Sequence, residues 1–103
     1  MENTSVEYLV SREPLWKVCE PVYEAFEKCK MENGDDPEKC LNRSTAVVGC
    51  ATKVMREISS KCKSELDAAV KNCENNNNRT IGNEKEEAAL TSCFDSKVFP
   101  KFC

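Results

Sequence analysis

The chain has 103 residues, of which 40% are hydrophobic and 32% are charged, and its net charge at neutral pH is −3. This length fits one small domain or two very small ones and excludes a large hydrophobic core. The acidic balance argues against nucleic acid as a partner, because nucleic-acid binding needs a basic face. No apolar run approaches the roughly 18 residues of a transmembrane span. We also expect no secretory signal, since residues 1–7 contain neither a basic nor an apolar region.

The first predicted element is an arm without regular structure. Residues 1–13 lack a helical hydrophobic stripe, and we expect an extended arm there that becomes ordered only against a partner. From Leu15 to Cys29 apolar residues recur at steps of three and four, which predicts an amphipathic helix. The sequence Asn-Gly-Asp-Asp-Pro at residues 33–37 ends this helix.

A second helical segment is expected directly after this break. Asp36 is placed to cap it, with Pro37 at its first position. Its apolar stripe continues as far as Cys73, and the sequence leaves open whether the helix runs unbroken through Cys62. Four consecutive asparagines, residues 75–78, end the helical pattern.

The last predicted helix begins after the asparagine run. Asn83, with Glu86 three residues later, resembles a capping box. Pro100 is expected to end this helix before Cys103.

The eight cysteines form four pairs, three with nine intervening residues and one with ten: Cys19–Cys29, Cys40–Cys50, Cys62–Cys73 and Cys93–Cys103. Residues ten apart on a helix are separated by about 15 Å along its axis, whereas a disulfide needs Cα atoms within about 7 Å. The two cysteines of one pair therefore cannot bond each other, and each must bond a cysteine on another helix. Two antiparallel helices with the same spacing form a ladder with two rungs. The predicted disulfides are Cys19–Cys50, Cys29–Cys40, Cys62–Cys103 and Cys73–Cys93.

A rival pairing would join Cys50 to Cys62 and Cys40 to Cys73. It requires a turn within residues 51–61, which contain no Gly, Pro or Asn and keep their helical stripe. We therefore predict an all-α fold of two disulfide-stapled antiparallel hairpins in tandem. The first hairpin covers residues 14–61, and the second covers residues 62–103 with an Asn-rich loop at residues 74–83.

Twin Cys-x9-Cys hairpins resemble the coiled-coil-helix-coiled-coil-helix (CHCH) proteins of the mitochondrial intermembrane space. Two fused hairpins with eight cysteines are similar to the PGIV-type accessory subunits of respiratory complex I. Three segments carry the likeness: Ala25-Phe26-Glu27-Lys28-Cys29-Lys30, Asp36-Pro37-Glu38-Lys39-Cys40-Leu41, and Cys50-Ala51 followed by Arg56, Ile58 and Cys62. The likeness spans residues 19–103 and is strongest up to Cys62.

This resemblance implies a non-catalytic accessory subunit of NADH:ubiquinone oxidoreductase in the respiratory electron-transport chain. Such a subunit braces the membrane arm from the intermembrane-space side, peripheral on the inner membrane. Its partners would be membrane-arm and accessory subunits of complex I and, during import, the disulfide relay of the intermembrane space. The import receptor of such proteins engages a cysteine flanked by apolar residues, a pattern offered by Tyr23, Phe26 and Cys29 or by Ile58 and Cys62.

The residue types argue against catalysis and against a metal or cofactor. The chain contains no histidine, and its smallest cysteine spacing exceeds the two to four residues that are typical of redox and zinc motifs. We therefore expect structural disulfides with no free thiol. A hairpin of two helices has little interior, so aromatic side chains are candidates for partner contact, namely Trp16, Phe94, Phe99 and Phe102.

Three other interpretations stay open. One is a different CHCH protein of the intermembrane space, either an assembly factor or a subunit of another respiratory complex. A second is a secreted cysteine-rich protein, for which the glycosylation sequons at Asn3, Asn42 and Asn78 would be the sign. The third is a thiol oxidoreductase, which would need free thiols in the mature protein.

Overall fold

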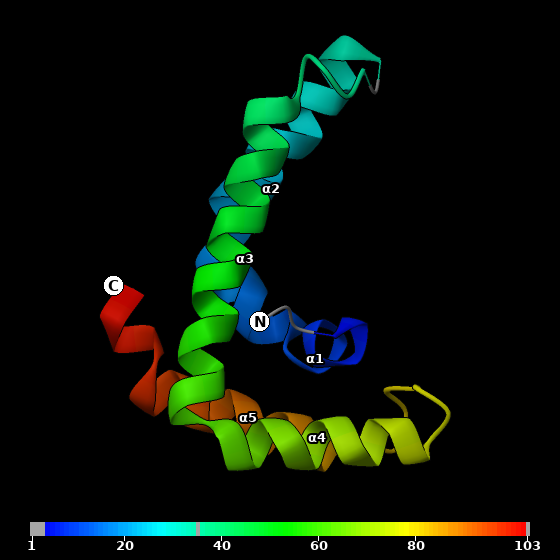
Figure 1. Ribbon diagram of the computed structural model, residues 1–103, viewed down its shortest axis with the longest axis vertical. Helices are drawn as coiled ribbons and strands as arrows, with labels where there is room; N and C mark the ends of the chain where they lie inside the picture. The colour runs from blue at the N-terminus through cyan, green and yellow to red at the C-terminus, as the bar shows by residue number, and fades with distance from the viewer. Residues whose placement is uncertain (1–3, 35, 103) are drawn as a thin grey trace.

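The protein folds into two helical hairpins that lie at an angle to each other (Figure 1). The computed structural model describes residues 4–34 and 36–102. These residues form the helices α1 (Ser5–Val10), α2 (Arg12–Asn33), α3 (Leu41–Lys61), α4 (Lys63–Asn75) and α5 (Glu84–Lys97), and the short 3-10 helix η1 (Phe99–Phe102). Helix α2 pairs with α3 and α4 pairs with α5, which confirms the predicted fold class.

The N-terminal segment is helical, so the expectation of an extended arm is wrong for residues 4–13. Thr4 and Glu7 form a capping box in which the Thr4 hydroxyl accepts from the Glu7 amide, and the Glu7 carboxylate accepts from the Thr4 amide at 2.7 Å. Helix α1 packs against α4, and Val10 at its end is buried. The capping pattern Thr-x-x-Glu was visible in the sequence, but burial against α4 was not.

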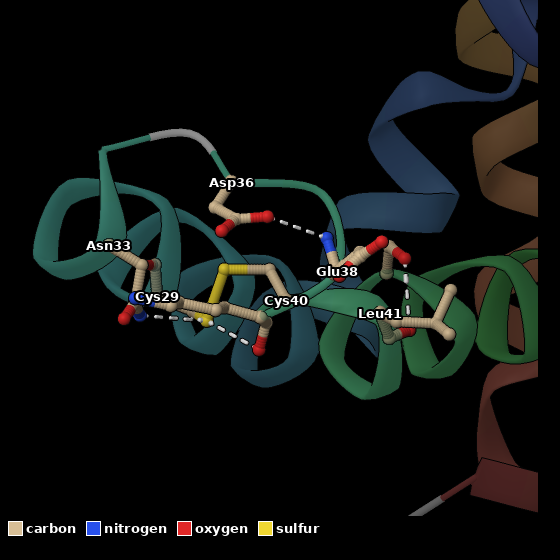
Figure 2. Close-up of a disulfide and its surroundings, with 8 residues drawn as sticks. Cys29, Asn33, Asp36, Glu38, Cys40 and Leu41 are labelled. Atoms are coloured by element: carbon tan, nitrogen blue, oxygen red, sulfur yellow. Dashed lines mark hydrogen bonds between the residues drawn. A yellow bond between two sulfur atoms is a disulfide. The ribbon is translucent and has the colours of Figure 1, made fainter.

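The turn between α2 and α3 is built from local hydrogen bonds (Figure 2). Gly34 ends α2 in the left-handed conformation (φ 61°), which glycine adopts without strain. The Asp36 carboxylate accepts from the Glu38 amide at 3.0 Å, so it caps a turn rather than a helix. Helix α3 consequently begins at Leu41 and not at Pro37, and Cys40 occupies its N-cap position.

The chain bends at Cys62, between the end of α3 and the start of α4. This bend makes the angle between the two hairpins (Figure 1). The asparagine-rich stretch then forms a turn in which Asn77 and Asn78 adopt positive φ values of 57° and 60°, a region where asparagine is enriched. Helix α5 therefore starts soon after the turn and runs back along α4.

The hydrophobic core lies at the bend, where α1, the start of α2, the second half of α3, α4 and α5 meet. We call this part the base, and residues 20–50, which project from it, the stalk. The largest fully buried apolar side chains all belong to the base: Val10, Val54, Met55, Ile58, Leu66, Leu90, Phe94 and Val98. Among the described residues of the stalk only Cys40 is buried. No helix in the described part of the chain is long and apolar enough to cross a membrane.

Candidate functional site

Two disulfides fasten the stalk, at its foot and near its tip. Cys19 bonds to Cys50 with a Cα–Cα distance of 6.0 Å, and Cys29 bonds to Cys40 with a distance of 5.9 Å. Both pairings were predicted and both are confirmed. They form because equal spacing on the two antiparallel helices brings the cysteines level at both rungs.

The second hairpin carries a different disulfide from those predicted. Cys62 bonds to Cys93 with a Cα–Cα distance of 6.1 Å, so the predicted pairs Cys62–Cys103 and Cys73–Cys93 are wrong. The prediction placed Cys73 and Cys93 together as the inner rung, on the two sides of the expected loop at residues 74–83. Because α5 already begins at Glu84, Cys93 lies level with Cys62 at the bend and far along α5 from the turn. Cys103 lies outside the described residues.

Asn83 occupies the place that a cysteine holds in the first hairpin. Both Cys40 and Asn83 are buried N-cap residues, and each stands ten positions before a bonded cysteine. The Asn83 amide group donates to the Ala69 carbonyl at 3.2 Å and to the Glu87 carboxylate at 3.0 Å. Its oxygen accepts from the Asn72 amide group at 2.8 Å. Asn83 thus joins α4 to α5 by hydrogen bonds, at a rung where the stalk has a disulfide.

The predicted capping box at Asn83 is therefore wrong. The Asn83 side chain makes no capping hydrogen bond to the first turn of α5, because it points inward and bonds α4 instead. Glu86 does not reach back to the Asn83 amide but approaches the Asn72 amide group at 3.3 Å.

Cys73 is a free, buried thiol, which corrects the expectation that no free thiol exists. Its sulfur lies 3.5 Å from the Arg79 carbonyl oxygen. Burial raises the pKa of the Cys73 thiol, and the negative charge of Glu87 raises it further. Reactive cysteines have a lowered pKa and access to solvent, so this thiol lacks both properties of a redox centre. No group of side chains in the described ranges could hold a metal ion.

The four aromatic candidates for partner contact fall into different environments. Trp16 is half exposed on the outside of α2. Phe94 is completely buried, so its assignment as a surface contact is wrong: α5 packs into the bend, where the two hairpins together make the interior that one hairpin lacks. Phe99 stacks on Phe94 with ring centroids 5.6 Å apart. Phe99 and Phe102 are partly buried against the core, and contact with a partner stays a prediction for these two.

The two candidate import sites are covered or cross-linked in the folded chain. Tyr23 and Phe26 are half-buried and Cys29 is bonded to Cys40. Ile58 and Cys62 are fully buried in the base. That either segment docks the import receptor stays a prediction.

The outer face of α2 presents an apolar surface that the sequence reasoning found only in part. The rings of Trp16 and Tyr23 stack with their centroids 5.9 Å apart. A hollow of about 480 Å³ lies on one side of this pair, and its lining is completed by Tyr8, Arg12, Leu15, Val47, Val48 and Ala51. A second hollow of about 370 Å³ adjoins the same two rings and extends to Met31. The repeat of apolar residues seven and eight positions apart was the available sequence signal.

Comparison with known proteins adds an independent line of evidence. The chain is 54% identical over 99 residues to NADH dehydrogenase (ubiquinone) 1 alpha subcomplex subunit 8 of Dictyostelium discoideum, covering 96% of this chain and 95% of that protein. It is 34% identical to subunit 8-B of Arabidopsis thaliana over 62% of this chain and 59% of that protein. Subunit 8-A of the same plant is 38% identical over 50% of this chain and 47% of that protein. No family model and no solved structure matches the chain.

Proposed function

The chain belongs to the family of NADH dehydrogenase (ubiquinone) 1 alpha subcomplex subunit 8, and we propose from this premise that it is a non-catalytic accessory subunit of mitochondrial complex I. The observation that carries the proposal is the 54% identity over nearly the full length of both chains. The PGIV-type resemblance seen in the cysteine motifs is thereby confirmed.

The proposed role is mechanical. The three disulfides among the described residues and a packed base hold two helical hairpins at an angle, in a body that measures 40 × 32 × 23 Å. A stalk with two covalent rungs resists unfolding although it has almost no core. Such a body suits a brace that joins neighbouring subunits through its exposed faces, and no electron or proton transfer is assigned to it.

We further place this subunit on the intermembrane-space side of the membrane arm, peripheral to the inner membrane. Its disulfides support this placement, because such bonds persist in oxidising compartments and are rare where thiols are kept reduced. Its partners are then other membrane-arm and accessory subunits of complex I.

The test is non-reducing blue-native separation of mitochondria that contain the tagged full chain. We expect the chain to migrate with complex I and to redistribute with it when the complex is dissociated. Migration with another respiratory complex, or only as a small free protein, contradicts the proposal. Its side of the membrane is tested on mitoplasts with an intact inner membrane, where added protease is expected to digest the tag. A tag that is digested only after the inner membrane is lysed places the subunit on the wrong side.

A further inference from the structure

One face of α2 combines exposed apolar side chains with carboxylates. Steps of three, four and seven residues place Trp16, Glu20, Tyr23, Glu27 and Met31 on this face. Trp16 is 50% exposed and Met31 is 85% exposed. Glu24, at the edge of the same face, lines the hollow between Tyr23 and Met31. We call these six residues the α2 stripe.

Two hollows adjoin the Trp16–Tyr23 pair, so this face offers concave sites as well as exposed apolar side chains. Val48, 64% exposed on α3, lines the first hollow together with Trp16. Met31 lines the second. From Trp16 to Met31 the stripe is about 22 Å long, at 1.5 Å per residue. That length matches four turns of a second helix.

The carboxylates of the stripe have too few cationic partners within the chain. In the described part of the structure, neither Glu20 nor Glu24 forms an ion pair with a lysine or arginine. Instead, interaction with the neighbouring Glu24 carboxyl raises the pKa of Glu20. Glu27 reaches Lys30 only at 3.7 Å, on the exposed surface. Like charges four residues apart destabilise a helix, so a cation from outside the chain would relieve an existing repulsion.

We propose that the α2 stripe is the docking surface for an α-helix of another complex I subunit, with apolar side chains at helical spacing and a lysine or arginine opposite Glu20 and Glu24. This inference rests on the proposed function, which supplies the class of partner. A helix suits the surface because nearly all backbone groups in the interior of α2 and α3 are paired within their own helices, so that side-chain ridges and grooves provide the contacts.

The charge of the stripe also argues against two other occupants. A second copy of the chain docked through the same face would bring carboxylates against carboxylates, and like charges across an interface are unfavourable. An anionic lipid surface attracts basic segments, whereas this face carries three glutamates. A basic, amphipathic helix satisfies both the apolar and the acidic part of the stripe.

The first experiment places the photo-cross-linking residue p-benzoylphenylalanine at position 31, in place of Met31, in the full chain in mitochondria. The matched control places it at position 81, in place of Ile81, which is similarly exposed at 81% but lies in the second hairpin. We expect the probe at position 31 to cross-link, within the complex I band, to one helical segment of another subunit that contains a lysine or arginine. A cross-link to a second copy of the chain or to lipid, or the same adduct from both positions, overturns the proposal.

The second experiment reverses charge with the pair Glu20→Lys and Glu24→Lys. We expect the amount of chain in the complex I band to fall by at least about tenfold, as a loss of 1.4 kcal/mol or more would produce. The control pair Asp67→Lys and Glu74→Lys makes the same change of charge on exposed positions of α4 and is expected to cost less than about twofold. Disulfide mapping and circular dichroism of both variants should match the unaltered chain.

The two experiments distinguish a failure of the proposed docking surface from a failure of the proposed function. If the unaltered chain does not migrate with complex I, the proposed function fails. If the unaltered chain migrates with complex I and the Glu20/Glu24 variant does so equally, the function stands and the assignment of the α2 stripe is wrong.

Discussion

The stalk and the base of this molecule are stabilised by different means. Of the three disulfides among the described residues, one lies near the tip of the stalk and one fastens its foot to the base. Yet Cys40 is the only buried residue among those described in the stalk. The base has one disulfide and nearly all of the buried apolar side chains. Covalent links are therefore concentrated where burial is least.

This division has a physical reason. A disulfide stabilises chiefly by restricting the unfolded chain, and it does so without requiring that side chains be removed from water. The stalk can consequently keep apolar residues such as Met31 and Val48 on its surface and remain folded. A base with a packed core fixes the direction in which the stalk projects. The following changes test whether the base depends on its packed core and the stalk on its disulfides.

The largest loss of stability is expected from the core of the base. Phe94→Ala removes a completely buried ring that stacks on Phe99, and such truncations cost about 3–5 kcal/mol. The matched change in the stalk is Phe26→Ala, at a half-buried ring beneath the Lys30 ammonium group, where we expect less than half of that loss. Denaturant unfolding of both variants measures the difference. Equal losses would show that the stalk also depends on a core.

The next largest effect concerns the tip of the stalk. Replacing Cys29 and Cys40 together by serine removes the disulfide nearest the turn, which closes a short loop and contributes about 3 kcal/mol or less. Serine is a favourable N-cap residue, so the start of α3 is not itself compromised at position 40. Hydrogen exchange should show reduced protection of the amides of the stalk, while α4 and α5 keep theirs. A uniform loss of protection in both hairpins would contradict the separation of stalk and base.

Because the second hairpin has Asn83 where the first has Cys40, we expect that a second disulfide can be built between α4 and α5. Asn83 matches Cys40 in position, and its side-chain oxygen accepts a hydrogen bond from Asn72, the residue directly before Cys73. With Asn83→Cys we expect a disulfide to Cys73 in the oxidised chain and a gain of up to about 2 kcal/mol after the lost hydrogen bonds are discounted. Asn83→Ala is the control; it removes the hydrogen bonds without a replacement and should cost about 1–3 kcal/mol.

Non-reducing peptide mapping reads the result directly. In the unaltered chain, Cys62 should be found with Cys93, and Cys73 should be alkylated only after unfolding. In the Asn83→Cys variant the thiol of Cys73 should be consumed. A free thiol at Cys73 in that oxidised variant would show that the two hairpins are not equivalent.

The first hairpin could be predicted from the sequence more fully than the second. The stripes of α2 to α5 and the disulfides of the stalk follow from local rules, because Gly34 fixes the turn and equal spacing fixes the register. The second hairpin follows a rule that is not local. Its disulfide Cys62–Cys93 spans 31 residues, as does Cys19–Cys50. This match was hidden because Asn83 stands at the position that Cys40 holds in the first hairpin.

Burial at the bend was the other feature beyond local pattern. Phe94 has the same apolar neighbours along α5 whether that helix is exposed or enclosed, so only the angle between the hairpins decides its environment. The sequence identified the face of α2 around Trp16 only in part. Its apolar spacing predicts a helix face, but the absence of covering side chains from the rest of the chain appears only in three dimensions.

The smallest expected effect concerns how the end of the chain is held against the base. Glu57 on α3 pairs with Lys101 of η1 and lies 3.4 Å from Lys61. These cations lower the pKa of the Glu57 carboxyl from its ordinary value of 4.5, with Lys101 as the main cause.

A lowered pKa in the folded state means that the pair stabilises the fold above about pH 4.5, and that this contribution is lost as the pH falls through the lowered value. Lys101→Ala should therefore shift the denaturant midpoint slightly downward at pH 7, and the shift should disappear below the lowered pKa of Glu57, where the carboxyl is protonated in both states. Because both side chains reach solvent, high salt at pH 7 should reduce the difference as well. A difference that persists below that pKa would assign the effect to packing of η1 on the base rather than to its charge.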